Sequence, residues 1–325
     1  MNYKYDLGWG NPYCLLEILS NLYRPRLLGT KITDLIYEED EGNEELIQYC
    51  KQITKQETGI DYKHVLITNG ATQALNSIIR AWSKTNATIE SVITSELGYP
   101  FYPTMIDKAS LKQIKVDFHK PFKAEKYSSI IMVDSPSNPL GYQFTVDKTD
   151  NFIIWDGVYH NKIYNANTFI QPKHDVFVGS FSKLLGLSGA RVGWLATNNK
   201  NFFDLFKTDS LYENATVSKV SQDLVLDILN NINLNYFMSY GMNSLDLNRE
   251  ELQKLSYLTG SDVQKIGMFY CAEIDDKLFD LFDRAGIQYV VFNRKNGNKM
   301  IRLNIAQTNE IIKKAVDSIL KIDRR

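Results

Sequence analysis

The segment SFSKLLGLSGARVGW, residues 180–194, contains one lysine, Lys183, between hydroxyl-bearing residues, and one arginine, Arg191, eight residues further on. Glycines and apolar residues surround both side chains. A lysine amine becomes a useful nucleophile when its pKa falls, and partial burial near another cation lowers that pKa. Ser180, Ser182 and Arg191 together could hold a phosphate dianion through charge-assisted hydrogen bonds. The segment therefore predicts a reactive lysine next to an anion site.

Short apolar runs around this segment predict buried strands, because they are brief and rich in β-branched residues. Helical periodicity follows several of them, and after Gly70 the apolar residues recur at three- and four-residue steps. This alternation is typical of an α/β domain with a mostly parallel, mixed central sheet between helices. The expected strands are His64–Thr68, Ser91–Thr94, Ser129–Val133, Phe152–Trp155 and Val176–Val178.

The C-terminal part predicts a second, smaller α+β domain. Residues 205–260 are expected to be mainly helical, and the final segment NEIIKKAVDSILKI has helical periodicity with Asn309 as its expected N-cap. We expect an N-terminal arm with the substrate-entry segment over 1–40, a large domain over 41–205, and a helical connection with the small domain over 206–325. The C-terminal strands are expected at Tyr270–Ile274, Tyr289–Phe292 and Met300–Ile305.

The composition narrows the possible classes of function. The 37 basic and 38 acidic residues give a net charge of −1, so no basic excess exists to hold a nucleic-acid backbone. Cys14, Cys50 and Cys271 form no CxxC pair, and their odd number argues against a disulfide framework, which favours a reducing cytoplasm. The four histidines show no close ligand spacing, so no metal site is expected. No apolar run is long enough for a membrane span.

The lysine segment resembles the signature of fold-type I pyridoxal 5'-phosphate (PLP) enzymes, the aspartate aminotransferase superfamily, in which S-x-S-K is followed by R-x-G. The resemblance implies that Lys183 carries PLP as a Schiff base, and that Ser180 and Arg191, with Ser182 beside them, bind the cofactor phosphate. The segment VLITNGATQALNSII is similar to the phosphate cup of this family, where a strand-to-helix junction with free N–H groups suits an anion. The implied cup residues are Gly70, Ala71 and Thr72.

Three further segments resemble family motifs in the expected order. In SELGYPFYPT, Tyr99 is implied to stack on the pyridine ring, with Tyr102 as the substitute. In DSPSNPLGY, Asn138 is implied to bind the phenolic oxygen of the cofactor and the substrate carboxylate. In FIIWDGVYHNKIY, Asp156 is implied to pair with the pyridine nitrogen, which makes the ring a better electron sink, and Tyr159 is implied to hydrogen-bond the phenolic oxygen.

Segments near the two ends of the chain resemble the substrate-binding parts of the family. MIRLNIA is similar to the strand that carries the arginine for the substrate, so Arg302 is implied to bind the α-carboxylate as a bidentate fork. DLGWGNP resembles the entry segment, in which Gly10 lets the backbone approach the substrate and Trp9 walls the pocket. Tyr37 and Gly42 fit Y-x4-G, whose tyrosine reaches the phosphate in the neighbouring subunit. The resemblance therefore implies a homodimer with shared active sites.

The chain departs from the family pattern in several places. Leu97 replaces the proline before the first tyrosine, and Gly157 replaces the glutamate after Asp156. Only 18 residues separate Asn138 from Asp156, so the helix usual at this point is expected to be missing or reduced to a turn. The C-terminal part also lacks the P-G-x-x-F/Y-G segment before the arginine strand. That region shapes the substrate pocket of the family, so the substrate class stays open.

The leading hypothesis is a PLP-dependent aminotransferase that moves an amino group between an amino acid and a 2-oxo acid, with Lys183 as the general base at the substrate Cα. A lyase, a decarboxylase or an amino-acid cyclase of natural-product type is the alternative, because fold and cofactor do not select the reaction. A non-catalytic PLP-binding regulatory protein is a third possibility. Such modules are usually fused to a DNA-binding domain, which this sequence does not indicate.

Overall fold

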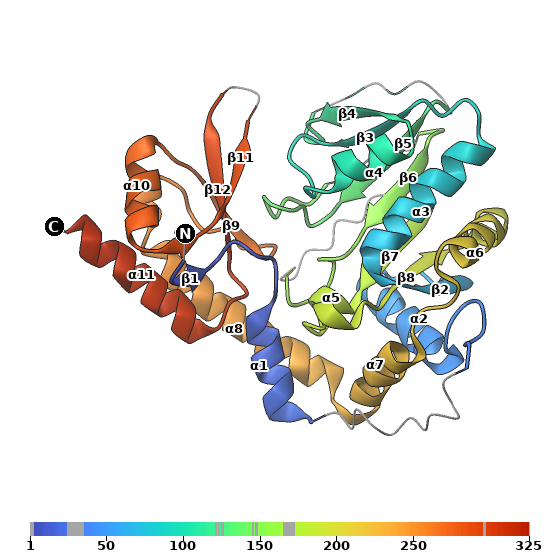
Figure 1. Ribbon diagram of the computed structural model, residues 1–325, viewed down its shortest axis with the longest axis horizontal. Helices are drawn as coiled ribbons and strands as arrows, with labels where there is room; N and C mark the ends of the chain where they lie inside the picture. The colour runs from blue at the N-terminus through green and yellow to red at the C-terminus, as the bar shows by residue number, and fades with distance from the viewer. Residues whose placement is uncertain are drawn as a thin grey trace.

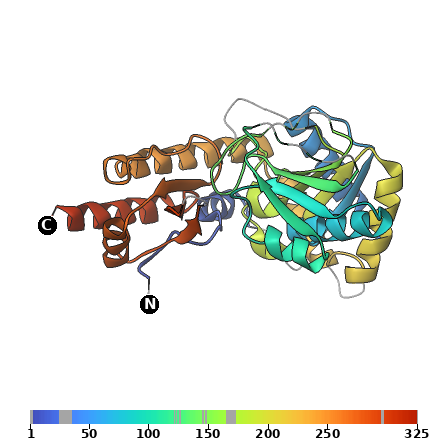
Figure 2. The same cartoon turned by 90° about the horizontal axis from the view of Figure 1, so that it is seen from above.

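The computed structural model has two lobes, a large one built around an extended sheet and a smaller one that holds both ends of the chain (Figure 1). The smaller lobe projects from one side of the larger lobe, as the view from above makes clear (Figure 2). The structure describes residues 3–24, 36–120, 122, 124, 127–144, 146, 149–164, 173–294 and 297–324.

The large lobe is organised by a mixed sheet. Its strands are β2 (His64–Thr68), β3 (Ser91–Ser95), β4 (Lys112–Val116), β5 (Ser129–Asp134), β6 (Phe152–Asp156), β7 (Val176–Ser180) and β8 (Gly193–Thr197). Among the described residues they lie in the order β2-β8-β7-β6-β5-β3-β4. Neighbours from β7 to β4 are parallel, whereas β8 runs antiparallel to both β2 and β7. The mostly parallel sheet predicted from the sequence is confirmed.

Helices cover both faces of this sheet. The helices of the large lobe are α2 (Glu44–Thr58), α3 (Gly70–Thr85), α4 (Tyr102–Lys108), α5 (Phe181–Leu184), α6 (Lys200–Asn214) and α7 (Lys219–Asn231). Val65 and Ile67 of β2 share a core cluster with α2, whereas Leu66 between them packs with α3. Successive strand side chains point to opposite faces, so α2 and α3 lie on opposite sides of the sheet. Strands β5, β6 and β7 are consequently buried along their whole length.

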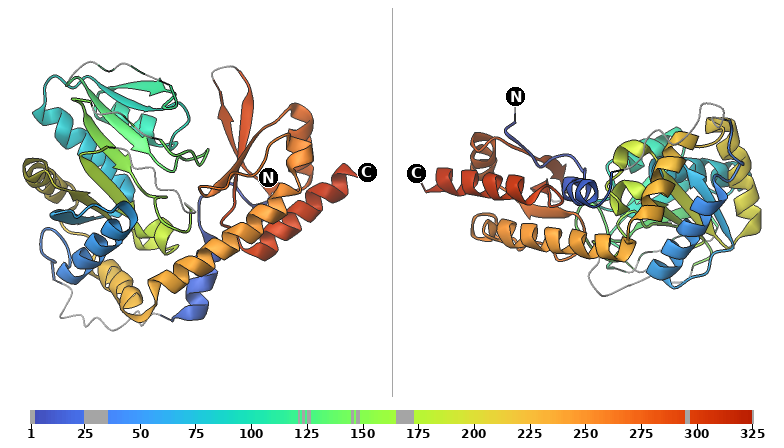
Figure 3. Two further views of the ribbon diagram at one scale, coloured as in Figure 1. Left: turned by 180° about the vertical axis from the view of Figure 1, so that it is seen from behind. Right: turned by 90° about the horizontal axis from the view of Figure 1, so that it is seen from below.

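The small lobe combines an antiparallel sheet with long helices. Its elements, with α1, are β1 (Tyr5–Asp6), α1 (Tyr13–Leu22), α8 (Leu234–Gln253), α9 (Ser256–Thr259), β9 (Phe269–Glu273), α10 (Asp276–Arg284), β10 (Ile287–Gln288), β11 (Val290–Asn293), β12 (Lys299–Asn304) and α11 (Asn309–Asp323). The sheet order is β11-β12-β9, and β1 pairs in parallel with β10. Helix α8 runs from below the large lobe into the small one, where it packs against α11 (Figure 3). The smaller α+β part predicted near the C-terminus is thus confirmed.

Each predicted strand is present, most with slightly shifted ends, but the short strands β1 and β10, the longer strands β4 and β8, and one helix cap were not predicted correctly. Strand β4 reads KQIKV, and its polar residues, which lie at the sheet edge, gave no strand pattern. Strand β8 begins within the last two residues of the lysine segment. The prediction of Asn309 as an N-cap is wrong, because Thr308 holds that position in extended conformation. The amide of Asn309 instead donates to the carbonyl oxygen of Ser244 and to the side chain of Asn248.

The connection between Asn138 and Asp156 contains no helix among its described residues, as the short spacing predicted. The predicted domain boundaries remain predictions. The division after residue 205 falls inside α6. The expected N-terminal arm includes residues 25–35, which lie outside the part of the chain that the structure describes. Within the described residues, no helix has both the length and the apolar character needed to cross a membrane.

Packing explains why Gly157 stands where the family has glutamate. Gly157 follows β6, and its N–H donates to the carbonyl oxygen of Val178 on the neighbouring strand. A Cβ atom added here would lie 2.1 Å from Cε2 of Phe177. The Phe177 ring is buried and packs against Trp155 and Trp194, so it could move away only by disturbing these neighbours. This departure therefore reflects a close contact between the backbone and an aromatic ring.

We expect Gly157→Ala to lower the free energy of unfolding by about 1–3 kcal/mol, because the new methyl group overpacks a filled core. Chemical denaturation of the full chain measures this change. Gly189→Ala is the matched control, since a Cβ there meets no atom within 4 Å. Equal stability of the two variants would contradict the packing explanation.

Candidate active site

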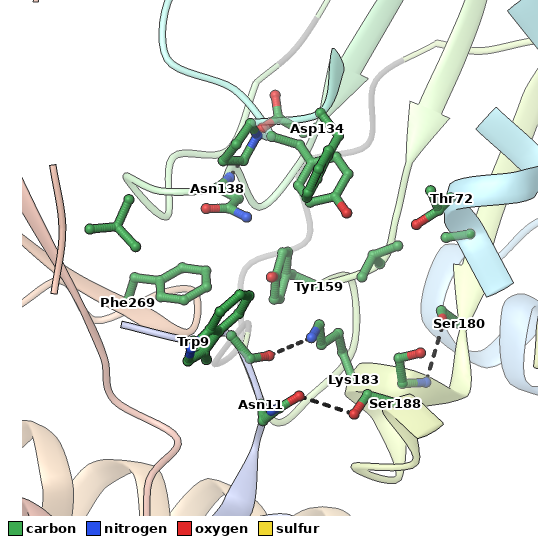
Figure 4. Close-up of a pocket in the computed structure, with 18 of the residues that line it drawn as sticks. Trp9, Asn11, Thr72, Asp134, Asn138, Tyr159, Ser180, Lys183, Ser188 and Phe269 are labelled. Atoms are coloured by element: carbon green, nitrogen blue, oxygen red, sulfur yellow. Dashed lines mark hydrogen bonds between the residues drawn. The ribbon is translucent and has the colours of Figure 1, made fainter. Parts of the chain in front are cut away.

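A cavity of about 460 Å³ lies at the carboxyl ends of the parallel strands and is lined on its other side by residues of the small lobe. Asp134, Asp156 and Ser180 are the last residues of β5, β6 and β7, and all three line it. Figure 4 shows side chains from both lobes converging on this space. The carboxyl edge of a parallel sheet is the usual ligand site of open α/β folds.

Lys183 projects into the cavity from the short helix α5. Ser180 caps this helix, and its Oγ accepts a hydrogen bond from the N–H of Ser182. The Nζ atom of Lys183 donates to the carbonyl oxygen of Gly10 (Figure 4). Burial, and then the positive charges of Arg302 and Arg191, lower the pKa of Lys183 to about 8. The neutral, nucleophilic form of the amine is therefore a minority near neutral pH, about a tenth at pH 7, but far more populated than for an exposed lysine.

Hydrogen bonds to its backbone carbonyl groups hold the N-terminal segment across the cavity. Arg302 Nη2 donates to the carbonyl oxygen of Gly8, and Asn304 Nδ2 donates to those of Trp9 and Asn11. Together with the bond from Lys183, these contacts engage four consecutive carbonyl groups. Side chains of both lobes thus hold one stretch of backbone, which forms a wall of the site.

One end of the cavity lies at the first turn of α3, where Ala71 and Thr72 line it. A Cβ atom on Gly70 would be 2.6 Å from Nη2 of Arg191, so only glycine lets this guanidinium lie against the helix start. A Cβ on Gly193 would be 2.9 Å from the backbone nitrogen of Ala71. Gly193, the glycine of R-x-G, therefore allows the backbone of β8 to lie directly against the backbone of the first turn of α3. Arginine and helix N–H groups together form an anion site.

A pair of buried carboxyl groups stands at the centre of the sheet edge. Asp134 and Asp156 pair in register, so their side chains lie on the same side of neighbouring strands. Tyr102 Oη donates to Asp156 Oδ2 at 2.6 Å, and Ser95 Oγ donates to Asp134 Oδ1 at 3.0 Å. Burial raises the pKa of Asp156 to about 6 and, with the charge of Asp156, raises that of Asp134 well above its usual range. The ionised member at neutral pH is therefore Asp156.

Arg302 of β12 forms the opposite end of the site. Its Nη1 atom donates to Oδ1 of Asn138 at 3.0 Å, and its guanidinium lies 4.2 Å from the centre of the Phe269 ring. The Nε atom of Arg302 is buried without a hydrogen-bond partner among the described residues. A carboxylate that reached this guanidinium would find a positive charge held in place by its neighbours.

The cavity brings together nearly all of the residues predicted from the sequence. Tyr99 lines it, whereas its substitute Tyr102 is buried behind and supports Asp156. Gly70 lies just beneath the lining, against Arg191. Tyr37 is 83% exposed and does not line the cavity of its own chain. The other predicted residues that line the cavity are Trp9, Gly10, Ala71, Thr72, Asn138, Asp156, Tyr159, Ser180, Ser182, Lys183, Arg191 and Arg302.

Sequence reasoning missed several residues that the structure places in the lining. Asp134 ends a predicted strand, and an acid at a strand end is a usable signal. Phe269, Gln288 and Tyr289 come from the small lobe, and their role depends on how that lobe packs against the large one. No local sequence pattern distinguishes these three from ordinary core or surface residues.

Comparison with known families gives an extended match. Residues 31–265, more than two thirds of the chain, match the family model described as Allinase. Among curated relatives, the (5-formylfuran-3-yl)methyl phosphate transaminase of Methanocaldococcus jannaschii is 26% identical over 186 residues, or 50% of this chain and 48% of that protein. Histidinol-phosphate aminotransferase of Helicobacter hepaticus is 28% identical over 186 residues, 49% of this chain and 50% of that protein. The alignments thus span about half the length of these relatives.

Solved structures show the same fold over nearly the whole chain. The aromatic aminotransferase from Pyrococcus horikoshii superposes with a TM-score of 0.78 at 18% identity, covering 98% of this chain and 95% of that one. Aspartate aminotransferase from Thermotoga maritima gives a TM-score of 0.77 at 19% identity, covering 98% and 92%. The family match over residues 31–265 places the chain in the allinase family, and the superpositions show that it has the fold of the fold-type I PLP-dependent enzymes.

Proposed function

We propose that this protein is a PLP-dependent aminotransferase that moves an amino group between an amino acid and a 2-oxo acid. The buried amine of Lys183, with a pKa lowered to about 8, is the observation that carries the proposal. It lies in a cavity with an anion site at one end and Arg302 at the other. Relatives named as a transaminase and an aminotransferase support the same type of reaction.

The residues of the cavity fit PLP. The cradle formed by Gly70 and Arg191, which a Cβ would fill, suits a phosphate, and Ser180, Ser182 and Thr72 would complete its ligands. Asp156 would accept a hydrogen bond from the ring nitrogen, and Lys183 would bind the aldehyde carbon. When bound, PLP supplies an electron sink that stabilises negative charge at the Cα of an amino acid.

The side chains of the protein would transfer the proton, orient the substrate and exclude water. Neutral Lys183 would take the proton from the substrate Cα and later return a proton, which requires a pKa near the working pH. Arg302 and Asn138 would orient the α-carboxylate, so that Cα is held within reach of the Lys183 amine. The N-terminal wall and the buried strand ends would keep water away from the site, which strengthens these electrostatic interactions.

We expect Lys183→Ala to reduce turnover by roughly a thousandfold or more, because the general base and the cofactor attachment are both lost. The native protein with PLP should absorb at roughly 420 nm, and an amino donor should shift that band to about 330 nm as the amino group is transferred. Lys254→Ala, an exposed lysine on the far end of α8, is the matched control. Substantial activity in Lys183→Ala would refute the assignment.

The same experiment distinguishes the alternative reactions. Release of ammonia, CO2 or a cyclised product, with the first band persisting, would favour a lyase, decarboxylase or cyclase at this site. PLP binding without any reaction across a broad panel of amino acids would favour a regulatory protein. No absorbance band at all would mean that Lys183 does not hold PLP.

The lowered pKa of Lys183 predicts the pH dependence of cofactor capture. Only the neutral amine attacks an aldehyde, so capture of PLP by the PLP-free protein should accelerate as the pH rises through about 8 and level off above it. Arg302→Gln should move the inflection to higher pH, because it removes a positive charge that lowers the pKa. Stopped-flow absorbance measures both profiles. A rate that does not change with pH would contradict this prediction.

We further propose a cytoplasmic homodimer in which Tyr37 reaches the phosphate bound by the partner subunit. Support comes from the exposure of Tyr37 and from three free, buried cysteines, which suit a reducing compartment. Sedimentation tests the dimer. Mixing Tyr37→Ala with Lys183→Ala chains should restore about a quarter of the native activity, because half of the random dimers carry one site with both native residues. Mixtures no more active than their components would exclude a shared site.

A further inference from the structure

Helix α5 carries Lys183 but is too short to hold it in place alone. The helix spans the four residues Phe181–Leu184, and the N–H of Leu185 donates to the carbonyl oxygen of Phe181 to close its turn. A helix leaves its last carbonyl groups without partners in its own backbone, and these must be bound by other groups. Contacts outside α5 therefore decide where the backbone of Lys183 lies.

We propose that Tyr164 is a positioning residue for Lys183, because it joins α5 to the small lobe and thereby sets where the amine lies in the cavity. The inference rests on the proposed function, in which Lys183 holds PLP. Tyr164 is buried behind the cavity and does not line it. It acts on the site only through the backbone of Lys183.

The hydroxyl group of Tyr164 reaches the backbone of α5. Its Oη atom donates to the carbonyl oxygen of Lys183 at 3.0 Å. Burial, the largest cause, raises the pKa of Tyr164 well above its usual range, so the hydroxyl stays protonated and remains a donor. The carbonyl group that it binds belongs to the residue whose side chain carries the amine. A displacement of this carbonyl would therefore displace the amine as well.

The ring of Tyr164 is fixed within the core. It packs edge-to-face against Tyr159, with ring centres 5.6 Å apart, and it belongs to the same hydrophobic cluster as Leu15 of α1 and Phe237 of α8. Tyr159 in turn lines the cavity. A buried aromatic ring with partners on several sides has little freedom to move. The phenol therefore acts as a rigid spacer between the core and the carbonyl group of Lys183.

The backbone of Tyr164 is bound to the small lobe. The N–H of Gly267 donates to the carbonyl oxygen of Tyr164 at 2.7 Å, and Nη2 of Arg249 in α8 donates to the carbonyl oxygen of Gly267 at 3.0 Å. A Cβ atom on Gly267 would lie 2.9 Å from Cα of Gly141, so the backbones of the two lobes are in direct contact here. Gly267 lies just before β9, which pairs with the strand of Arg302.

Tyr164 thus connects the two ends of the site. Its hydroxyl holds the residue that carries the amine, and its carbonyl group holds the segment that leads into the sheet of Arg302. A misplacement of about 1 Å can slow a reaction on the order of 100-fold. Removal of the hydroxyl would leave every side chain of the cavity unchanged, but it would release the backbone of Lys183.

The attack of the Lys183 amine on the aldehyde carbon of PLP, with loss of water, tests this role without a substrate. Rapid mixing of the PLP-free full chain with increasing PLP gives two quantities, the limiting rate constant of bond formation and the half-saturating concentration of the binding step before it. We expect Tyr164→Phe to lower the limiting rate constant by roughly tenfold and to change the half-saturating concentration by less than about twofold, because only the position of the amine changes.

Tyr270→Phe is the matched control. Tyr270 is also fully buried, and its hydroxyl also donates to a backbone carbonyl, that of Ser261 at 3.1 Å, but it does not line the cavity. Both variants should lose stability in chemical denaturation, whereas only Tyr164→Phe should slow bond formation. Equal limiting rate constants in the two variants would overturn the proposal. Absence of bond formation in the native chain would instead refute the proposed function, and this inference with it.

A double-mutant cycle tests the connection to the small lobe. Gly267→Ala should slow bond formation by roughly threefold in the native chain and have no further effect in Tyr164→Phe, because the connection is already broken there. Gly260→Ala is the matched control: Gly260 has a φ of +63°, positive like the +86° of Gly267, yet a Cβ there meets no atom within 4 Å. Equal effects of Gly267→Ala in both backgrounds would show that the small lobe does not act through Tyr164.

Discussion

The register of the parallel strands β5, β6 and β7 is the constraint on which the site depends. Asp134 of β5 lies opposite Asp156 of β6, and β7 pairs with β6 and ends at Ser180. These three residues of the site therefore lie at the same carboxyl edge of the sheet. These strands are buried on both faces. A slip of one residue would turn each side chain to the other face and place apolar residues at the edge, which the surrounding helices prevent. Helix α5 with Lys183 then starts directly from β7.

The second half of the site is attached to the first through backbone carbonyl groups. The N-terminal segment belongs to the small lobe, because β1 pairs with β10. Its carbonyl groups accept hydrogen bonds from Lys183 in the large lobe and from Arg302 and Asn304 in the small one. The amine and the guanidinium are thus positioned by one stretch of chain. This arrangement also brings positive charge near Lys183, which contributes to its lowered pKa.

Features that depend on the local sequence could be predicted, whereas features that depend on contacts between distant segments could not. Most of the buried strands depend on local composition and were predicted with small errors at their ends, whereas the buried strand β8 was missed. The contact of Arg302 with Asn138 depends on the packing of one lobe against the other, which no local pattern reveals. Gly157 is explained only by Phe177 on the neighbouring strand. Asn309 was misplaced because the N-cap depends on backbone conformation, which residue type indicates only statistically.

Helix α8 connects the lobes as one uninterrupted element of 20 residues, which corresponds to a rod of about 30 Å. Its first turn lies near α7 and α1, and its far end carries the small lobe beside α11. A rod converts rotation at one end into displacement at the other. A tilt of about 10° at the junction with α7 would move the far end by roughly 5 Å. Such a tilt would therefore displace the small lobe much more than it displaced the junction itself.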